Sequence, residues 1–227
     1  AQAVQALATL FVLTWLVKHG GTVVLSETTE MIGTEEVLAR RAASPDLGDR
    51  IKELVINQRK KTEEILGPLA NIVISPGNIE GGLTNITEKS LGCIIKGGTS
   101  TINEVLEYGA GPTQKGLVIM DTPGSDIFSL TAMAAGGCQV MIFTTGRGTP
   151  AGFPVVPVIK VASNSELYEN MMDDMDVDAG RVLEGLGINQ AGAELSELLT
   201  RVADGDQTKA EMNLQDVVSI HTVGPAF

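Results

Sequence analysis

Short apolar runs rich in β-branched residues recur along this chain and alternate with longer amphipathic segments. Runs of this kind are typical of strands buried on both faces, as in a parallel sheet. They cover residues 22–26, 71–74, 116–120, 139–143 and 155–161. The segments between them have the composition of helices. These cover residues 34–43, 47–66, 87–96, 126–136 and 193–204.

Strands that alternate with helices predict βαβ units. We therefore expect an α/β fold of the Rossmann-like, doubly wound kind, with a mainly parallel sheet and helices on both of its faces. The length of 227 residues, of which 43% are hydrophobic, is sufficient for one such domain over residues 1–227.

Charge and cysteine content narrow the classes of partner. The net charge is −12 with only 16 Lys and Arg, and no basic run occurs, so a nucleic-acid partner is not expected. The apolar segment 6–17 is too short to span a bilayer and is predicted to be a buried helix, which favours a cytoplasmic protein without membrane contact. Cys93 and Cys138 lack zinc-type spacing and are expected to be free, buried thiols.

Clusters of polar residues follow the predicted strands directly. In an open parallel sheet the carboxyl ends of the strands share one edge, and ligands bind in the crevice there. The clusters are therefore expected to converge on one site. They occupy residues 26–30, 75–78, 121–126 and 144–149.

The last of these clusters reads Thr-Thr-Gly-Arg-Gly-Thr and includes Thr144, Thr145, Gly146 and Arg147. Glycine lets the main chain approach a ligand closely, and the planar guanidinium suits bidentate recognition of a carboxylate. We interpret the segment as an anion-binding loop; the alternative is a plain connection between strand and helix.

Carboxylates of the first and third clusters are candidates for a metal site. Glu27 and Glu30 are three residues apart and could present both side chains to a hard divalent cation, while Asp121 or Asp126 could add another oxygen. The alternative is that Glu30 only decorates the helix that follows.

Three further polar residues admit two interpretations each. Asn78, after Ser-Pro-Gly, could orient a ligand or simply form a turn. Lys89 follows a glycine turn into a helix, where it is either solvated or a contact for a carboxylate. Lys160 lies within an apolar strand and must leave at its end or find a carboxylate partner, because an unpaired buried charge is costly.

Other catalytic patterns are missing from the sequence. The two histidines, His19 and His221, give little support for a Ser/His/Asp triad, and no Gly-x-Ser-x-Gly elbow occurs. Walker A and Gly-x-Gly-x-x-Gly patterns are also missing, which weakens a nucleotide-binding interpretation.

Several motifs, taken in order, resemble the C-terminal region of the altronate and galactarate dehydratase family. The resemblance extends over most of the chain, from about residue 16 to the end. The motifs lie at residues 75–78, 81–92, 120–124, 143–150, 157–160 and 176–180.

The resemblance implies a metal-dependent hydro-lyase. Such an enzyme, commonly with Fe²⁺ and with Mn²⁺ or Ca²⁺ able to occupy the site, dehydrates a sugar acid of the galactarate or altronate type. It removes the proton α to a carboxylate and expels the β-hydroxyl. An arginine on the substrate carboxylate and a divalent metal would stabilise the charge that develops.

The family also implies further domains. Its Rossmann-like C-terminal domain is preceded by a dimerising region and a small β-clip domain, and neither these nor its Cys-Gly-Gly-Ser-Asp segment is found in this sequence. We expect the C-terminal part of a larger dehydratase, or the large piece of a split enzyme with a small partner subunit. The complete protein is expected to form a homodimer, and the chain alone to have little or no activity.

Carried onto matching positions, the resemblance assigns roles to individual residues. The metal candidates are Glu27, Glu30 and Asp121. The catalytic candidates are Arg147, Lys89 and Glu88. The substrate-binding candidates are Asn78, Thr144, Thr145, Gly146 and Lys160. The base stays open among Glu88, Lys89 and Lys160, or lies outside this sequence.

Two other functions compete with the dehydratase. One is the large subunit of a lyase that expels sulfite from sulfolactate, an enzyme similar to the same family. In that lyase the pattern after the fourth strand lacks an arginine, so Arg147 favours the dehydratase. The other is a non-catalytic Rossmann-like module that binds an anion.

Overall fold

The structure, a computed structural model, describes residues 9, 12–67 and 85–219. In this part of the chain all paired strands are parallel and helices pack with them, which confirms the predicted α/β class, although two pairs of successive strands have no helix between them. The strands form two three-stranded sheets with the orders β1-β3-β2 and β4-β5-β6. They are β1 (Thr22–Leu25), β2 (Ile102–Leu106), β3 (Gly116–Met120), β4 (Met141–Thr145), β5 (Val158–Ala162) and β6 (Val177–Asp178).

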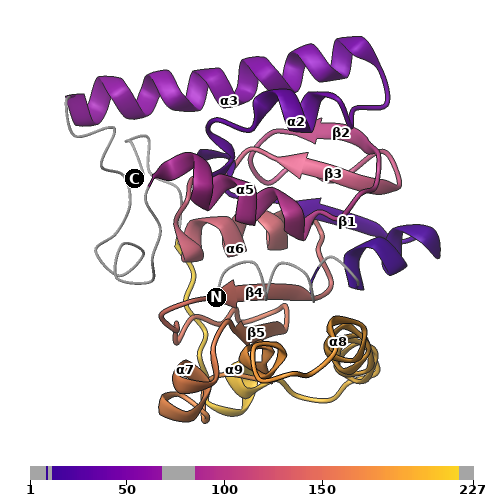
Figure 1. The fold of residues 1–227 in the computed structure, drawn as a ribbon, viewed down its shortest axis with the longest axis vertical. Coiled ribbons are helices and arrows are strands. Elements are labelled where there is room, and N and C mark those ends of the chain that lie inside the picture. The colour runs from indigo at the N-terminus through magenta and orange to yellow at the C-terminus, as the bar shows by residue number, and fades with distance from the viewer. Residues whose placement is uncertain (1–8, 10–11, 68–84, 220–227) are drawn as a thin grey trace.

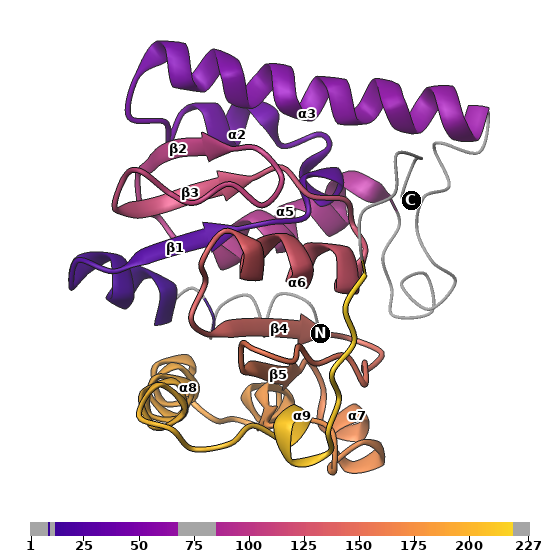
Figure 2. The ribbon, with the colours of Figure 1, turned by 180° about the vertical axis from the view of Figure 1, so that it is seen from behind.

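Helices gather at both ends of the molecule and between the sheets. In Figure 1, α2 and α3 lie at the end that holds β2, while α7, α8 and α9 surround β5 at the other end. Figure 2 shows the same arrangement from behind, with α6 between the sheets. The helical elements are η1 (Thr28–Met31), α2 (Glu35–Ala39), α3 (Pro45–Leu66), α5 (Ile86–Lys96), α6 (Asp126–Ala135), α7 (Ser165–Asn170), η3 (Ala179–Val182), α8 (Ile188–Ala203) and α9 (Lys209–Met212).

The predicted strands and helices within the described residues correspond to these elements, with shifts of up to five residues at their ends. The run 116–120 coincides with β3, and the runs 22–26, 139–143 and 155–161 contain most of β1, β4 and β5. The expected strand at 71–74 lies outside the described residues. Because the described strands divide into two sheets, the single Rossmann-like sheet is not confirmed.

The first sheet packs against α3. Ser44 caps this helix by accepting a hydrogen bond from the Leu47 backbone N–H at 3.2 Å, and Pro45 occupies its first turn. Ile51 and Val55, one turn apart, are fully buried and belong to the same core cluster as Leu117 of β3. An amphipathic helix thus covers one face of the β1-β3-β2 sheet.

The second sheet packs against α8. Leu195 and Leu199 of α8 share a core cluster with Ile159 and Val161 of β5. Val12, in the helical segment 12–18, belongs to this cluster too. Within the described residues, no helix combines the length and the apolar character needed to cross a membrane.

Helix α6 and the segment 12–18 join the two sheets. In α6, Leu130 packs with Met141 of β4, and Ala132 packs with Val118 of β3. In the segment 12–18, Leu16 contacts both of the main core clusters. Side-chain packing therefore holds the sheets beside each other.

The motif at residues 176–180 is explained by close backbone approach. Asp178 accepts a hydrogen bond from the Gly180 backbone N–H at 2.8 Å. A methyl group on Gly180 would lie 2.2 Å from the Ser165 backbone nitrogen. Only a residue without Cβ fits at this contact between η3 and the start of α7.

We expect Gly180→Ala to lower the free energy of unfolding by about 2 kcal/mol or more, because the neighbouring atoms are backbone and cannot rotate away. Gly111→Ala is the matched control, since a methyl group there would meet its nearest neighbour, the Gly136 carbonyl, at an ordinary 3.6 Å. Urea unfolding of both variants measures the difference. Equal stabilities would contradict the packing described here.

Candidate functional site

A cavity of about 240 Å³ lies where β1 and β4 end. Its walls come from the turn after β1, one face of α5, the start of α6 and the loop after β4. This is the edge at which ligands bind in open parallel sheets. The predicted site residues that line it are Glu27, Glu30, Lys89, Asp126, Thr144, Thr145, Gly146 and Arg147.

The turn after β1 has an unusual backbone that the end of β3 holds in place. Glu27 adopts a left-handed conformation with φ 64°, which is uncommon for a residue with a side chain. Its backbone N–H donates to the Thr122 hydroxyl at 2.7 Å, and the Thr28 hydroxyl donates to Asp121 Oδ1 at 2.6 Å. These bonds fix the turn that carries Glu27 and Glu30 into the cavity.

Helix α5 presents one row of side chains to that turn. Lys89, Cys93 and Lys96 are spaced four and three residues apart, so they share a face of the helix. The Lys89 ammonium forms an ion pair with Glu30 Oε1, and Cys93 Sγ donates to Glu30 Oε2 at 2.8 Å. Both oxygens of Glu30 are therefore engaged by α5.

The two glutamates carry different charges because their surroundings differ. Burial, reinforced by the negative charge of Glu30, raises the pKa of Glu27 to about 8. Burial would also raise the pKa of Glu30, but Lys89, Lys96 and the bond from Cys93 hold it below its ordinary value. At neutral pH the pair therefore holds one proton, on Glu27.

The lysines stay protonated for the converse reason. Burial would lower the pKa of Lys89, but Glu30 holds it above its ordinary value. Burial acts in the same way on Lys96, whose pKa the negative charge of Glu30 helps to hold above its ordinary value. Burial also raises the pKa of the Cys93 thiol, which stays neutral. The wall formed by α5 thus contributes two positive charges.

The loop after β4 forms the opposite wall. The Thr145 hydroxyl accepts hydrogen bonds from the backbone N–H groups of Arg147 at 3.3 Å and Gly148 at 3.0 Å, which closes a tight turn. Within the described residues Arg147 forms no ion pair, and the buried Thr144 hydroxyl has no hydrogen-bond partner. A cation and an unsatisfied hydroxyl at one cavity are suited to an anionic, hydroxylated ligand.

Other predicted residues lie elsewhere or outside the described part. Asp121 does not line the cavity, and its Oδ1 accepts from Thr28 and from Gln58 Nε2 at 2.7 Å. Glu88 is exposed and also absent from the cavity wall. Lys160 points to a different cluster, considered below. Asn78 lies outside the described residues.

Sequence reasoning missed Lys96 and the cavity-facing position of Cys93. The spacing in the sequence could have identified them, because Cys93 and Lys96 follow Lys89 by four and seven positions and therefore lie on the same face of the helix. Both side chains also line a second, mainly apolar cavity of about 410 Å³ between β1 and β4. Cys93 and Cys138 are free, as predicted, but half-buried rather than fully buried.

Glu27 and Glu30 provide two carboxylates of the kind that hard divalent cations prefer. Two carboxylates that compete for one proton also form a site where a cation would relieve repulsion. Within the described residues, however, no group of three or more His, Cys, Asp or Glu side chains is placed to hold a metal ion. The donor type fits, and Asp126 at the start of α6 also lines the cavity, although it does not complete a group of three ligands with Glu27 and Glu30.

Comparisons with known proteins give a consistent result. The family described as D-galactarate/Altronate dehydratase, C-terminal, matches residues 7–226. An altronate dehydratase of Bacillus subtilis (strain 168) is 41% identical over 170 residues, which is 75% of this chain and 34% of the relative. A galactarate dehydratase (L-threo-forming) of Escherichia coli (strain K12) is 41% identical over 197 residues, which is 84% of this chain and 36% of the relative.

A third relative has a different activity in its name. The (2R)-sulfolactate sulfo-lyase subunit beta of Chromohalobacter salexigens is 36% identical over 203 residues, which is 86% of this chain and 51% of that subunit.

The fold and the cavity define an α/β domain with a polar site at the carboxyl ends of its strands. The chain belongs to the galactarate and altronate dehydratase family and corresponds to its C-terminal region, as the resemblance implied. It spans about a third of the length of the two dehydratases described above.

The raised pKa of Glu27 predicts a pH-dependent stability in the presence of a chelator. Between the ordinary pKa of 4.5 and about 8, the folded protein holds a proton that the unfolded chain releases, so stability falls as pH rises through this window. Glu27→Gln removes this loss. The Tm of the variant should therefore gain on the wild type from pH 5 to pH 9, whereas Glu53→Gln, at an exposed carboxylate of α3, should leave the pH profile unchanged. Parallel Tm profiles for wild type and Glu27→Gln would contradict the assignment.

Proposed function

We propose that this chain is the C-terminal domain of a hydro-lyase that dehydrates a sugar acid of the galactarate or altronate type. The observation that carries the proposal is the meeting of Glu27, Glu30 and Arg147 at one cavity, although these residues come from distant parts of the chain. Membership of the dehydratase family supports the same reaction class.

The substrate carboxylate binds to Arg147 in this proposal. The guanidinium offers a planar fork of donors and has no competing ion pair among the described residues. The Thr144 and Thr145 hydroxyls and the backbone at Gly146 face the same cavity and would contact the hydroxyls of the sugar acid.

Lys89 and Lys96 stabilise negative charge and do not take the α-proton. A lysine with a raised pKa is protonated at neutral pH and is a poor base, but its ammonium group lowers the energy of an anion formed beside it. Loss of the α-proton places negative charge on the substrate carboxylate and its neighbouring carbon. We assign the two lysines to this charge.

Glu27 and Glu30 are the proposed metal ligands, with Fe²⁺ as the expected ion. A divalent cation there would supply further positive charge to the substrate carboxylate. Asp121 is not included, because it does not line the cavity. The remaining ligands would come from the substrate, from water or from residues outside the described part.

The base is proposed to come from another part of the protein. Lys89 is protonated, Glu88 is exposed and does not line the cavity, and Lys160 is engaged elsewhere. A contribution from a further domain or a small partner subunit is in keeping with dehydratase relatives more than twice as long, and with a relative named as a beta subunit. The cytoplasmic location and the homodimer stay predictions.

A sulfolactate lyase is the second candidate function. The similarity to the sulfo-lyase subunit favours it. The described lining of the cavity adds no feature that is specific for a sulfonate. A non-catalytic anion-binding module is the third. Activity on sugar acids separates both from the main proposal.

The complete gene product, reduced and supplied with Fe²⁺, should convert galactarate or altronate into the corresponding 2-oxo-3-deoxy acid. The 227-residue chain alone should show little or no turnover, because it lacks the proposed base. Glu27→Gln should weaken Mn²⁺ binding, followed by electron paramagnetic resonance, while Glu53→Gln should not. Release of sulfite from sulfolactate without any dehydration of sugar acids would favour the second candidate, and Mn²⁺ binding that Glu27→Gln leaves unchanged would exclude the proposed ligand.

Arg147→Ala should lower kcat/KM for the best sugar acid by about 100-fold, because the substrate carboxylate loses its fixed charge partner. Arg147→Lys should recover only part of this loss, since lysine keeps the charge but not the bidentate fork. The matched control is Arg50→Ala at an exposed position of α3. Steady-state kinetics over a series of sugar acids gives the measurement, and an unchanged kcat/KM would remove Arg147 from the site.

A further inference from the structure

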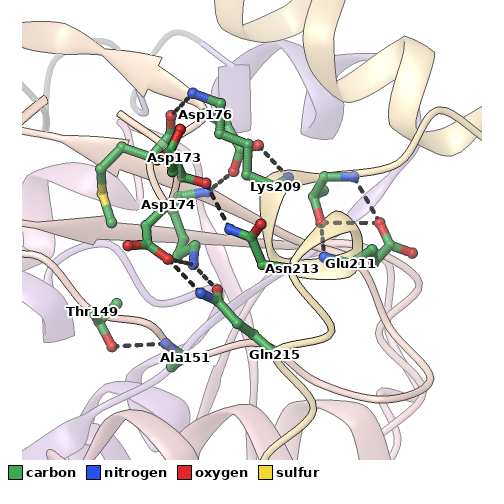
Figure 3. A network of polar contacts seen from close by, with 12 residues as sticks. Thr149, Ala151, Asp173, Asp174, Asp176, Lys209, Glu211, Asn213 and Gln215 are labelled. Carbon is green, nitrogen blue, oxygen red and sulfur yellow. Dashed lines mark hydrogen bonds and ion pairs between the residues drawn. The ribbon is translucent and has the colours of Figure 1, made fainter. Parts of the chain in front are cut away.

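Lys160 is a completely buried cation that does not line the cavity to which sequence reasoning assigned it. It lies on β5, where its ammonium donates to Gln215 Oε1 and lies 4.0 Å from Asp174 Oδ1. Gln215 also donates to Asp174 (Figure 3). Because a buried ammonium without partners is costly, Lys160 constrains the positions of both residues.

A second set of contacts fastens the same two segments together. The Lys209 ammonium donates to the Met172 carbonyl and, at 2.6 Å, to the Met175 carbonyl. The Lys209 backbone N–H donates to Asp176 Oδ1 at 2.9 Å, and Asn213 donates to the Asp173 carbonyl at 2.7 Å (Figure 3). We call these segments, residues 171–176 and 209–215, the clamp.

The clamp holds the loop that carries Arg147. A methyl group on Gly148 would lie 2.1 Å from Met171 Sδ, and one on Gly152 would lie 2.0 Å from the Gln215 backbone oxygen. Each segment of the clamp therefore touches the loop backbone directly. Thr149 and Ala151, between these two contacts, are buried.

The orientation of the Arg147 side chain depends on the backbone of this loop. Its guanidinium forms no ion pair with the described residues, so no side-chain partner fixes its direction. The loop is held by the hydrogen bonds to the Thr145 hydroxyl, by the bond from the Ala151 backbone N–H to the Thr149 hydroxyl, and by the contacts at Gly148 and Gly152.

We propose that Lys160 is a positioning residue for Arg147, acting through Asp174, Gln215 and the clamp. The inference rests on the proposed function, in which Arg147 binds the substrate carboxylate. Removal of the buried charge frees Gln215 and Asp174, loosens the contact at Gly152 and lets the guanidinium move away from its binding position. Lys160 itself does not touch the substrate.

The test uses the complete gene product with Lys160→Met, which keeps the length of the side chain and suits a buried site. We expect KM for the best sugar acid to rise about 10-fold with kcat within about twofold, because a displaced arginine weakens binding. In an Arg147→Ala background the same substitution should leave KM unchanged, since no guanidinium remains to be positioned. Lys61→Met, at an exposed position of α3, is the control. Equal effects of Lys160→Met in both backgrounds would overturn the proposal.

Hydrogen exchange provides a readout that does not depend on turnover. Lys160→Met should speed exchange of the amides at residues 146–152 more than those of β3, and Lys61→Met should not. If Lys160→Met fails to fold, Gln215→Leu carries the same measurements. Faster loop exchange in a protein that dehydrates no sugar acid would keep the clamp and reject the proposed function. Unchanged loop exchange in an active enzyme would reject the clamp.

Discussion

The structure depends on the balance of charge between the turn after β1 and one face of α5. Glu27 and Glu30 are drawn into a common cavity, where each carboxylate makes ionisation of the other more costly. Lys89 and Lys96 offset this cost for Glu30, and Glu27 retains a proton instead. The left-handed backbone at Glu27 persists because Thr122 fixes it from the end of β3. Buried like charges and a left-handed backbone are both energetically unfavourable, and such features are concentrated at functional sites.

Sequence patterns predicted most of the longer strands, because these strands are continuous apolar runs. β3 is buried at all of its positions, and its predicted bounds agree with the structure. β2 was missed because it is half-polar: Asn103 donates to the Lys115 carbonyl, and Glu104 accepts from Thr113 and Gln114. Its polar side chains bind the loop at residues 113–115, and a search for apolar runs does not detect a strand of this kind. The two-residue β6 is too short to give any pattern.

The candidate site was predicted in outline for a different reason. Clusters that follow parallel strands meet at one edge whatever their separation in the chain, so Glu27, Glu30 and Arg147 could be grouped without a structure. The direction of a side chain is not fixed by this rule. Asp121 turns toward Thr28 and Gln58, and Lys160 turns toward Gln215, because each finds a hydrogen-bond partner outside the cavity. These partners lie far away in the sequence, so no local sequence pattern predicts them.

The strands divide into two sheets, and the cavity lies between the end of β1 in one sheet and the end of β4 in the other. Its width therefore depends on how the two sheets are held together. In the described part of the chain, no backbone ladder joins β1 to β4, and an apolar space of about 410 Å³ separates them. A hydrogen-bonded ladder fixes register, whereas packed side chains can slide by small amounts. The carboxylates belong to one sheet and Arg147 to the other, so α6 and residues 12–18 set the width of the cavity. Substitutions in these helices can therefore tune the affinity for a ligand that they never touch.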